Sequence, residues 1–132
     1  MEILKKLNNL SEKRIKYFLE NGDSMTWYKW SKTYWEYLKN EIEEAQDELN
    51  TNQVYLEDEL GDVLWDYLCL LNSLKTEWKI SSIEKVLERA YTKYSWRINI
   101  ENGNYNWDWQ EIKQEQKKKL EEEIKNLEDN KK

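Results

Sequence analysis

The sequence contains no histidine and no proline, and its 132 residues include only three glycines and one cysteine. The absence of histidine excludes a Ser-His-Asp triad, a Cys-His pair, an HExxH zinc site and a Glu-x-x-His di-iron bundle. Any acid–base catalysis must therefore use carboxylates, lysine or tyrosine. The single cysteine, Cys69, excludes an internal disulfide and a Cys-based structural zinc site, and it fits a reducing compartment.

The scarcity of turn-forming residues predicts an all-α chain, because a β-sandwich, a barrel or a glycine-rich nucleotide loop needs them at its turns. The length is near the modal size of one domain, so we predict a single domain over residues 1–132. Only 39% of the residues are hydrophobic, but eight tryptophans and nine tyrosines supply large apolar areas for a core.

Net charge and hydropathy argue against two classes of partner, nucleic acids and membranes. The formal net charge of −6 opposes binding to the phosphates of nucleic acid. No apolar run approaches the roughly 20 residues that cross a bilayer. The amino-terminal stretch MEILKKLNNLSEKR is too interrupted by charge for a signal peptide. We therefore expect a cytoplasmic protein with neither a nucleic-acid nor a membrane partner.

Apolar residues recur with a helical period along four segments. The predicted helices run from residue 1 to about 20, from after Ser24 or Thr26 to Leu49, from about Val54 to Leu74, and from Ser81 to about Tyr94. The third is the most hydrophobic and should be central, and Ser81 and Glu84 have the spacing of a capping box at the start of the fourth. We expect a loop over Asn99 to Asn106 and a charged C-terminal helix or tail over 110–132.

The second predicted helix has an acidic edge. At about 100° per residue, Glu41, Glu44 and Glu48 border its apolar stripe. Glu43 and Asp47 point toward solvent instead. Such spacings are common on solvated helices in a chain of which 36% is charged, so one motif alone indicates little.

The third predicted helix carries a second acidic edge, formed by Glu59, Asp62 and Asp66. A short connection between the two helices forces an antiparallel hairpin, in which the two edges can meet. Glu41 and Glu44 would then share a concave surface with Glu59 and Asp62. The pairing of two motifs on consecutive helices favours a functional site over a merely solvated face.

Carboxylates this close raise one another's pKa unless a cation lies between them. Ligand sets made only of carboxylates select Mg²⁺ or Mn²⁺ over zinc or copper. Bound Mg²⁺ keeps several waters and bridges to substrate phosphates. The acidic hairpin therefore predicts a magnesium site that acts on a phosphate-bearing substrate.

Two segments resemble a known family. Glu41-Ile-Glu-Glu44, followed by Leu56-Glu-Asp-Glu59-Leu-Gly-Asp62-Val-Leu-Trp, is similar to the EExxE, spacer, ExxD signature of the MazG-like all-α nucleoside triphosphate pyrophosphohydrolases. The resemblance covers about residues 26–98. It implies a four-helix bundle built around the acidic hairpin and a metal, assembled as a homodimer or homotetramer. It also implies hydrolysis of a (d)NTP to the (d)NMP and pyrophosphate, a reaction that serves nucleotide-pool cleaning.

The resemblance carries over residue by residue. The implied metal ligands are Glu41, Glu44, Glu59 and Asp62. Glu41 or Glu44 would also orient the attacking water, since Asn40 stands where the full motif has its leading glutamate. An alternative register places EExxE on Glu43-Glu44-Ala-Gln-Asp47. We prefer the first register because helical angles turn Glu43 and Asp47 away from the core edge.

Cations and aromatic residues complete the predicted site. Arg89, Lys93 and Arg97 recur at i+4 spacing, and the resemblance implies that they contact phosphate; the alternative is a solvated basic face. The candidates for contact with the base or nucleotide are Trp27, Trp30 and Asp66. Trp30 also continues the apolar stripe inward, so packing alone is the alternative for either tryptophan, as a helix-surface role is for Asp66.

Two functions follow from the sequence. The first is a Mg²⁺-dependent nucleoside triphosphate pyrophosphohydrolase. The alternative is a non-enzymatic helical oligomerisation or interaction protein, with solvated acidic edges and with aromatic residues at an oligomer interface. A divalent cation should raise the melting temperature of the first and leave that of the second nearly unchanged.

Overall fold

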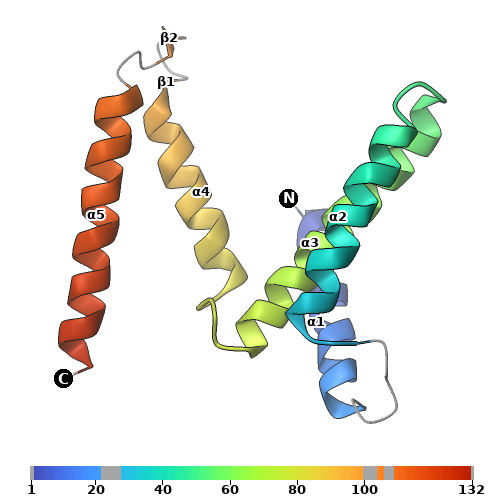
Figure 1. Ribbon diagram of the computed structural model, residues 1–132, viewed down its shortest axis with the longest axis horizontal. Coiled ribbons are helices and arrows are strands. Elements are labelled where there is room, and N and C mark those ends of the chain that lie inside the picture. The colour runs from blue at the N-terminus through green and yellow to red at the C-terminus, as the bar shows by residue number, and fades with distance from the viewer. Residues whose placement is uncertain (1, 22–27, 100–103, 106–108, 132) are drawn as a thin grey trace. The chain divides into compact units, whose positions relative to one another are not determined.

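The computed structural model describes residues 2–21, 28–99, 104–105 and 109–131. The described residues form helices and one short strand pair (Figure 1). In chain order these are α1 (Glu2–Glu20), α2 (Ser31–Asp47), α3 (Gln53–Thr76), α4 (Ile83–Arg97), β1 (Ile98–Asn99), β2 (Asn104–Tyr105) and α5 (Trp109–Asn130). The predicted all-α class is confirmed.

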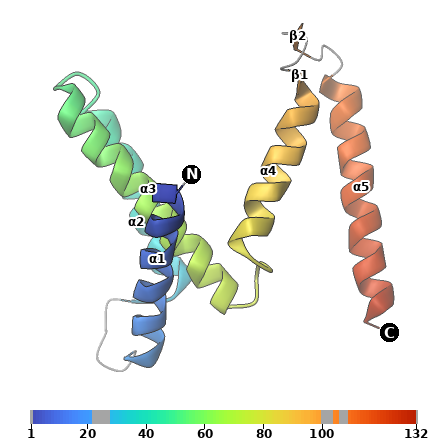
Figure 2. The same ribbon diagram turned by 180° about the vertical axis from the view of Figure 1, so that it is seen from behind.

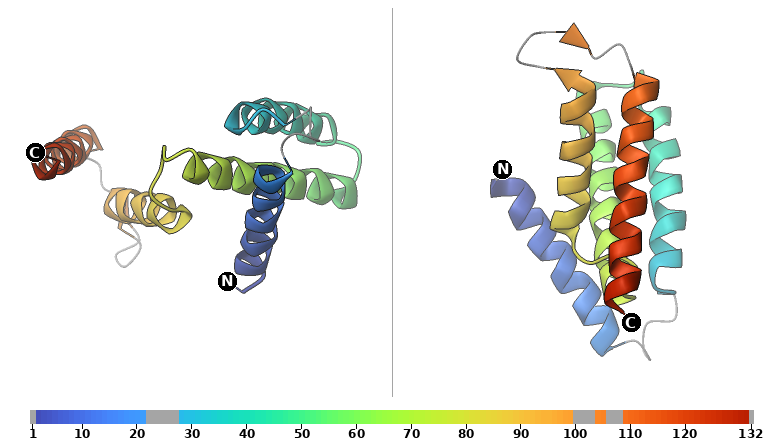
Figure 3. Two further views of the ribbon diagram at one scale, coloured as in Figure 1. Left: turned by 90° about the horizontal axis from the view of Figure 1, so that it is seen from below. Right: turned by 90° about the vertical axis from the view of Figure 1, so that its left-hand side faces the viewer.

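The chain divides into two compact units, Met1–Ile83 and Glu84–Lys132. A single domain over residues 1–132 stays a prediction. In the first unit, α2 and α3 lie side by side as an antiparallel hairpin, and α1 crosses α3 (Figures 1 and 3). Helix α3 packs against both other helices, so the most hydrophobic predicted helix is central in this unit.

The core of the first unit lies where the three helices meet. Its buried members are Ile15, Phe18, Tyr28, Tyr34, Cys69 and Leu70. The rings of Phe18 and Tyr28 are 4.8 Å apart, and the Tyr28 hydroxyl lies 3.1 Å from Ser73 Oγ. Asn72 Nδ2 donates to Ser11 Oγ at 2.6 Å, so a buried hydrogen bond also ties α1 to α3. This packing fixes the C-terminal half of α3 against the other two helices.

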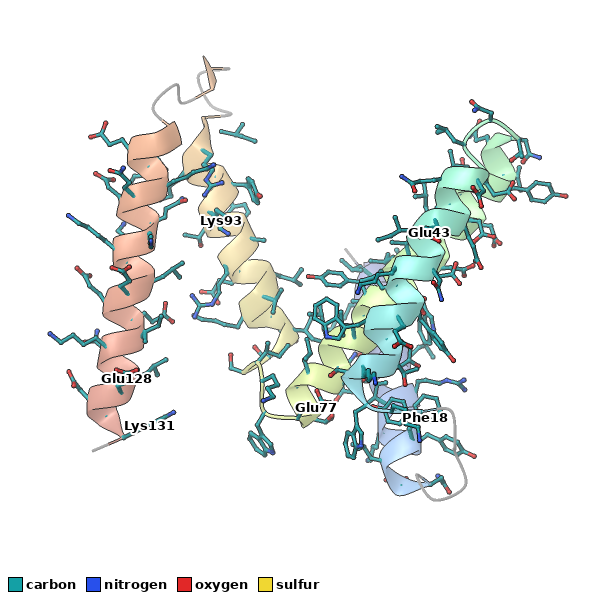
Figure 4. The ribbon with its side chains drawn as sticks, viewed as in Figure 1. Phe18, Glu43, Glu77, Lys93, Glu128 and Lys131 are labelled. Carbon is teal, nitrogen blue, oxygen red and sulfur yellow. The ribbon has the colours of Figure 1, made fainter. Side chains whose placement is uncertain are left out.

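Helix α2 begins at Ser31, so the prediction of a start after Ser24 or Thr26 was wrong. Trp30 has φ 62° and ψ −147°, a backbone conformation that a helix cannot contain and that glycine adopts most easily. Ser31 N and Ser31 Oγ both donate to Glu77 Oε1, at 3.1 and 3.0 Å. Glu77, labelled in Figure 4, therefore caps the start of α2 from the C-terminal end of α3.

The other helix ends lie close to their predicted positions. Asn52 Oδ1 accepts from Tyr55 N at 2.8 Å and caps α3. Ser82, not Ser81, precedes the first residue of α4, so the predicted capping box was displaced by one residue.

The second unit is an antiparallel pair of helices, α4 and α5, which lie side by side (Figure 2). The connection includes a two-residue strand pair, in which Ile98 pairs with Tyr105 and Asn99 with Asn104. The sequence had predicted only a loop there. The charged C-terminal helix was predicted correctly and is α5. Across the described parts of the chain, no helix is both long and apolar enough to cross a membrane.

Candidate metal centre

The α2–α3 hairpin brings acids from both helices together. Glu41 and Glu44 lie one turn apart on α2, and Glu59 lies on the facing helix α3. One carboxylate oxygen from each of these three residues lies within 4.8 Å of the other two. Asp58, Glu59 and Asp62 meet the same distance limit, so Glu59 belongs to both groups. The sequence segments predicted to carry the metal ligands thus meet along one hairpin.

The structure adds Asp58, an acid that sequence reasoning did not single out. Its exposed side chain lies on α3 next to Glu59 and four residues before Asp62. That i, i+4 spacing to Asp62 was the available signal. On α3, the family signature places metal ligands only at the Glu and Asp of ExxD, which are Glu59 and Asp62. Asp58 is not part of that motif and was therefore overlooked.

Two oxygens of this cluster are buried without a donor. Among the described residues, Glu41 Oε2 and Glu59 Oε2 are the buried side-chain atoms that have no hydrogen-bond partner. Burial, the hydrogen bond to Glu44 and the charges of Glu44 and Asp62 raise the pKa of Glu41 to about 7. Burial also raises the pKa of Glu59, although its hydrogen bond with Glu41 opposes that shift. Buried carboxylates facing one another need a proton or a cation between them.

The donor set fits a hard divalent cation. It consists only of carboxylate oxygens, which suit Mg²⁺ and Mn²⁺ better than zinc or copper. Burial and the negative charges of Asp58 and Glu44 raise the pKa of Asp62, as expected at a site with negative charge to neutralise. The two buried oxygens without donors are the atoms whose desolvation a cation would offset.

Glu43 and Asp47 define the alternative register, and both are exposed on α2. Figure 4 labels Glu43. Neither residue belongs to the acidic groups found among the described residues. Beside those groups, Ile42 and Leu60 are 44% and 51% exposed. The apolar stripes near the acids are therefore not covered within the first unit.

Asp66 lies one turn beyond Asp62 and is buried, with 7% of its surface exposed. Its pKa is raised to about 6, first by burial and then by the charges of Asp62 and Glu44. Asp66 therefore belongs to the electrostatic environment of the acidic cluster.

The two tryptophans predicted to contact the base are Trp27 and Trp30. Trp27 lies outside the described residues. The prediction that Trp30 points inward was wrong, because Trp30 precedes α2 and is 51% exposed. Its ring centroid lies 6.1 Å from that of Tyr28. Along the axis of α2, Ser31 lies about 15 Å from Glu41, at 1.5 Å per residue.

The predicted phosphate contacts lie on α4, in the second unit. Arg89 binds Glu123 of α5 through two hydrogen bonds of 2.6 and 3.0 Å. Arg97 Nε donates to Gln116 Oε1 at 3.2 Å, and the guanidinium lies 5.6 Å from the centroid of the Tyr94 ring. Lys93, labelled in Figure 4, has an exposed side chain. The acid that pairs with Arg89 is distant in sequence, so spacing within α4 could not reveal it.

Comparison with known proteins identifies the family. The model of the MazG nucleotide pyrophosphohydrolase domain matches residues 30–100, more than half of the chain. That range includes α2, α3 and α4 and therefore the whole acidic cluster. Searches of curated proteins and of solved structures gave no significant match. The chain belongs to the MazG nucleotide pyrophosphohydrolase family.

Proposed function

We propose that this protein is a Mg²⁺-dependent nucleoside triphosphate pyrophosphohydrolase that converts a (d)NTP to the (d)NMP and pyrophosphate. The observation that carries the proposal is the approach of Glu41, Glu44 and Glu59 within 4.8 Å, inside the segment that matches the family. The buried oxygens of Glu41 and Glu59 that lack a donor support a cation at this position.

The proposed metal ligands are Glu41, Glu44, Glu59 and Asp62. Mn²⁺ would fit the same oxygen donors. When bound, the metal would offset the charge of the triphosphate and lower the pKa of a water. Glu41 or Glu44 would orient the attacking water and accept its proton. The first register of the signature is supported because neither Glu43 nor Asp47 belongs to the acidic groups found among the described residues.

The remaining roles follow from residue chemistry. Arg89, Lys93 and Arg97 would bind phosphate oxygens, because guanidinium and ammonium groups form charge-assisted hydrogen bonds with them. Trp27 and Trp30 would stack on the base, and Asp66 would contact the nucleotide or an ordered water. The exposed position of Trp30 leaves its ring accessible to a base.

The deciding experiment is a panel of ribo- and deoxynucleoside triphosphates incubated with the full chain and Mg²⁺ or Mn²⁺. We expect one molecule of pyrophosphate per nucleoside monophosphate formed, and no turnover in EDTA. Release of orthophosphate would contradict the proposed bond cleavage. Inactivity across the whole panel would contradict the enzymatic proposal.

A second function is favoured by one observation. The α2–α3 hairpin exposes several large apolar side chains within its unit. They are Ile42, Leu49, Leu60, Leu64 and Tyr67. Such a surface fits a helical interaction protein that uses the hairpin for oligomerisation. It equally supports a homodimeric or homotetrameric enzyme, so turnover and metal binding separate the two functions.

A further inference from the structure

The two helices of the second unit enclose a groove rich in cations. Its volume is about 340 Å³. Lys85, Arg89 and Lys93 line it from α4, and Lys119 lines it from α5. The Lys119 ammonium lies 4.8 Å from the centroid of the Trp96 ring. Two carboxylates, Glu88 and Glu123, also line the groove, and Lys85 Nζ lies 3.8 Å from Glu88 Oε2. Cations therefore outnumber carboxylates in the lining, which favours an anionic ligand.

A carboxylate of the same chain already occupies part of this groove. Glu123 Oε1 accepts from Arg89 Nη2 at 2.6 Å, and Glu123 Oε2 accepts from Arg89 Nη1 at 3.0 Å. This is the fork geometry in which a guanidinium also binds two phosphate oxygens. Both hydrogen bonds lower the pKa of Glu123, so its carboxylate is ionised at neutral pH.

A second contact sets the register of α5 against α4. Gln116, two turns before Glu123, accepts from Arg97 Nε at 3.2 Å and donates to the Lys93 carbonyl at 3.1 Å. Helix α5 also lies beyond the segment that matches the family, which ends at residue 100. Glu123 therefore lies outside the matched segment.

We propose that Glu123 holds Arg89 in place of a phosphate group, so that α5 is an intramolecular competitor of phosphate-bearing ligands at Arg89. This rests on the proposed function in so far as Arg89 is taken there as a phosphate contact. A ligand that binds Arg89 through two phosphate oxygens must first displace Glu123. Removing the Glu123 carboxylate therefore favours binding at Arg89.

The test is calorimetric titration of the full chain with inorganic tripolyphosphate in EDTA. The variant Glu123→Gln removes one negative charge and the bidentate acceptor. We expect it to bind about two- to fivefold more tightly than the parent, the range set by a partly exposed ion pair. Glu122→Gln is the matched control, because it changes the net charge equally at the exposed neighbouring position.

A double-mutant cycle assigns the gain to Arg89. When Arg89 is replaced by glutamine, adding Glu123→Gln should raise the affinity for tripolyphosphate no more than adding Glu122→Gln does. The proposal is overturned if Glu123→Gln and Glu122→Gln bind equally, or if the gain persists without Arg89. Should Glu123→Gln lose helicity by circular dichroism, Glu123→Ala replaces it, with Glu122→Ala as its control, because alanine also removes the carboxylate and favours a helix. Equal affinity of these two variants would likewise overturn the proposal.

Activity provides an independent readout. In an active enzyme, Glu123→Gln should lower KM for the triphosphate by the same factor and leave kcat unchanged. The titration needs neither a metal nor turnover. An inactive protein that still shows the Arg89-dependent gain would contradict the proposed function and support the competition. An active enzyme in which Glu123→Gln does not bind tripolyphosphate more tightly would support the proposed function and contradict the competition.

Discussion

Glu41 and Glu59 face each other across the hairpin with buried oxygens that no donor among the described residues satisfies. Sequence periodicity placed both residues at the edge of an apolar stripe. It could not show that their carboxylates meet, because that depends on the register of two helices. The candidate ligands were therefore accessible from sequence, whereas their burial and their grouping with Asp58 required the fold.

Replacing a single acid of the cluster should abolish turnover and preserve the fold. We expect Glu44→Gln or Asp62→Asn to reduce kcat/KM at least about 100-fold, because each change removes a charged metal ligand. Relief of repulsion among like charges should leave the melting temperature of the metal-free protein unchanged or raised. Pyrophosphate release and thermal melting in EDTA measure the two effects.

Glu43→Gln is the matched control for these variants, because Glu43 is an exposed glutamate on the same helix. It should retain parental turnover. Full activity in Glu41→Gln together with loss in Glu43→Gln would instead support the alternative register, because Glu44 belongs to both registers.

The metal-free protein should lose stability as pH rises. In the folded state the pKa of Glu41 is about 7, against an ordinary 4.5, and that of Asp66 is about 6, against 3.8. The folded state therefore holds these protons more tightly than the unfolded chain, and the free energy of unfolding falls with increasing pH. The contribution is complete below the ordinary values and is lost as pH passes through about 6 and 7.

Urea unfolding in EDTA at pH 5 and pH 8 measures this effect, and Glu41→Gln should reduce the difference. Adding Mg²⁺ or Mn²⁺ should raise the melting temperature more at pH 8 than at pH 5, because the ligands are then deprotonated. Equal stability of the metal-free parent at the two pH values would contradict the assigned shifts.

At the scale of elements, the start of α2 is set by a residue 46 positions away in sequence. Glu77 accepts both the backbone N–H and the hydroxyl of Ser31, and Trp30 takes a positive φ immediately before them. Sequence periodicity had extended the helix back to Ser24 or Thr26. Such reasoning finds caps within one turn and cannot find a cap supplied by another helix.

Removing this cap should destabilise the hairpin. We expect Glu77→Ala to lower the free energy of unfolding by about 1 kcal/mol, the usual effect of losing a helix N-cap. Urea denaturation at pH 7 measures it. Glu36→Ala, at an exposed acid of α2, is the control and should change stability much less. Equal losses in the two variants would contradict a capping role for Glu77.

At the scale of the whole molecule, the exposed apolar side chains of the hairpin support assembly as a homodimer or homotetramer. Leu64 is 39% exposed, and Leu60 on the preceding turn of α3 is 51% exposed. A charged residue there would be buried without a partner in an interface, which is costly. We expect Leu64→Glu to shift the protein toward the monomer in sedimentation equilibrium.

Asn50→Glu adds the same charge in the exposed turn between α2 and α3 and should leave the assembly state unchanged. A parent that sediments as a monomer would contradict the assembly proposal. Dissociation by both variants would indicate a general charge effect instead.

The sequence by itself determined the all-α class, the central position of α3 and the presence of acidic edges on α2 and α3. Those conclusions rest on composition and on periodicity within one helix, both of which are local. Only the tertiary structure decided that Glu41 meets Glu59, that Glu77 caps α2 and that Glu123 binds Arg89. Each of these contacts joins different helices, and the spacing of residues along one helix does not specify which side chains of another will face it.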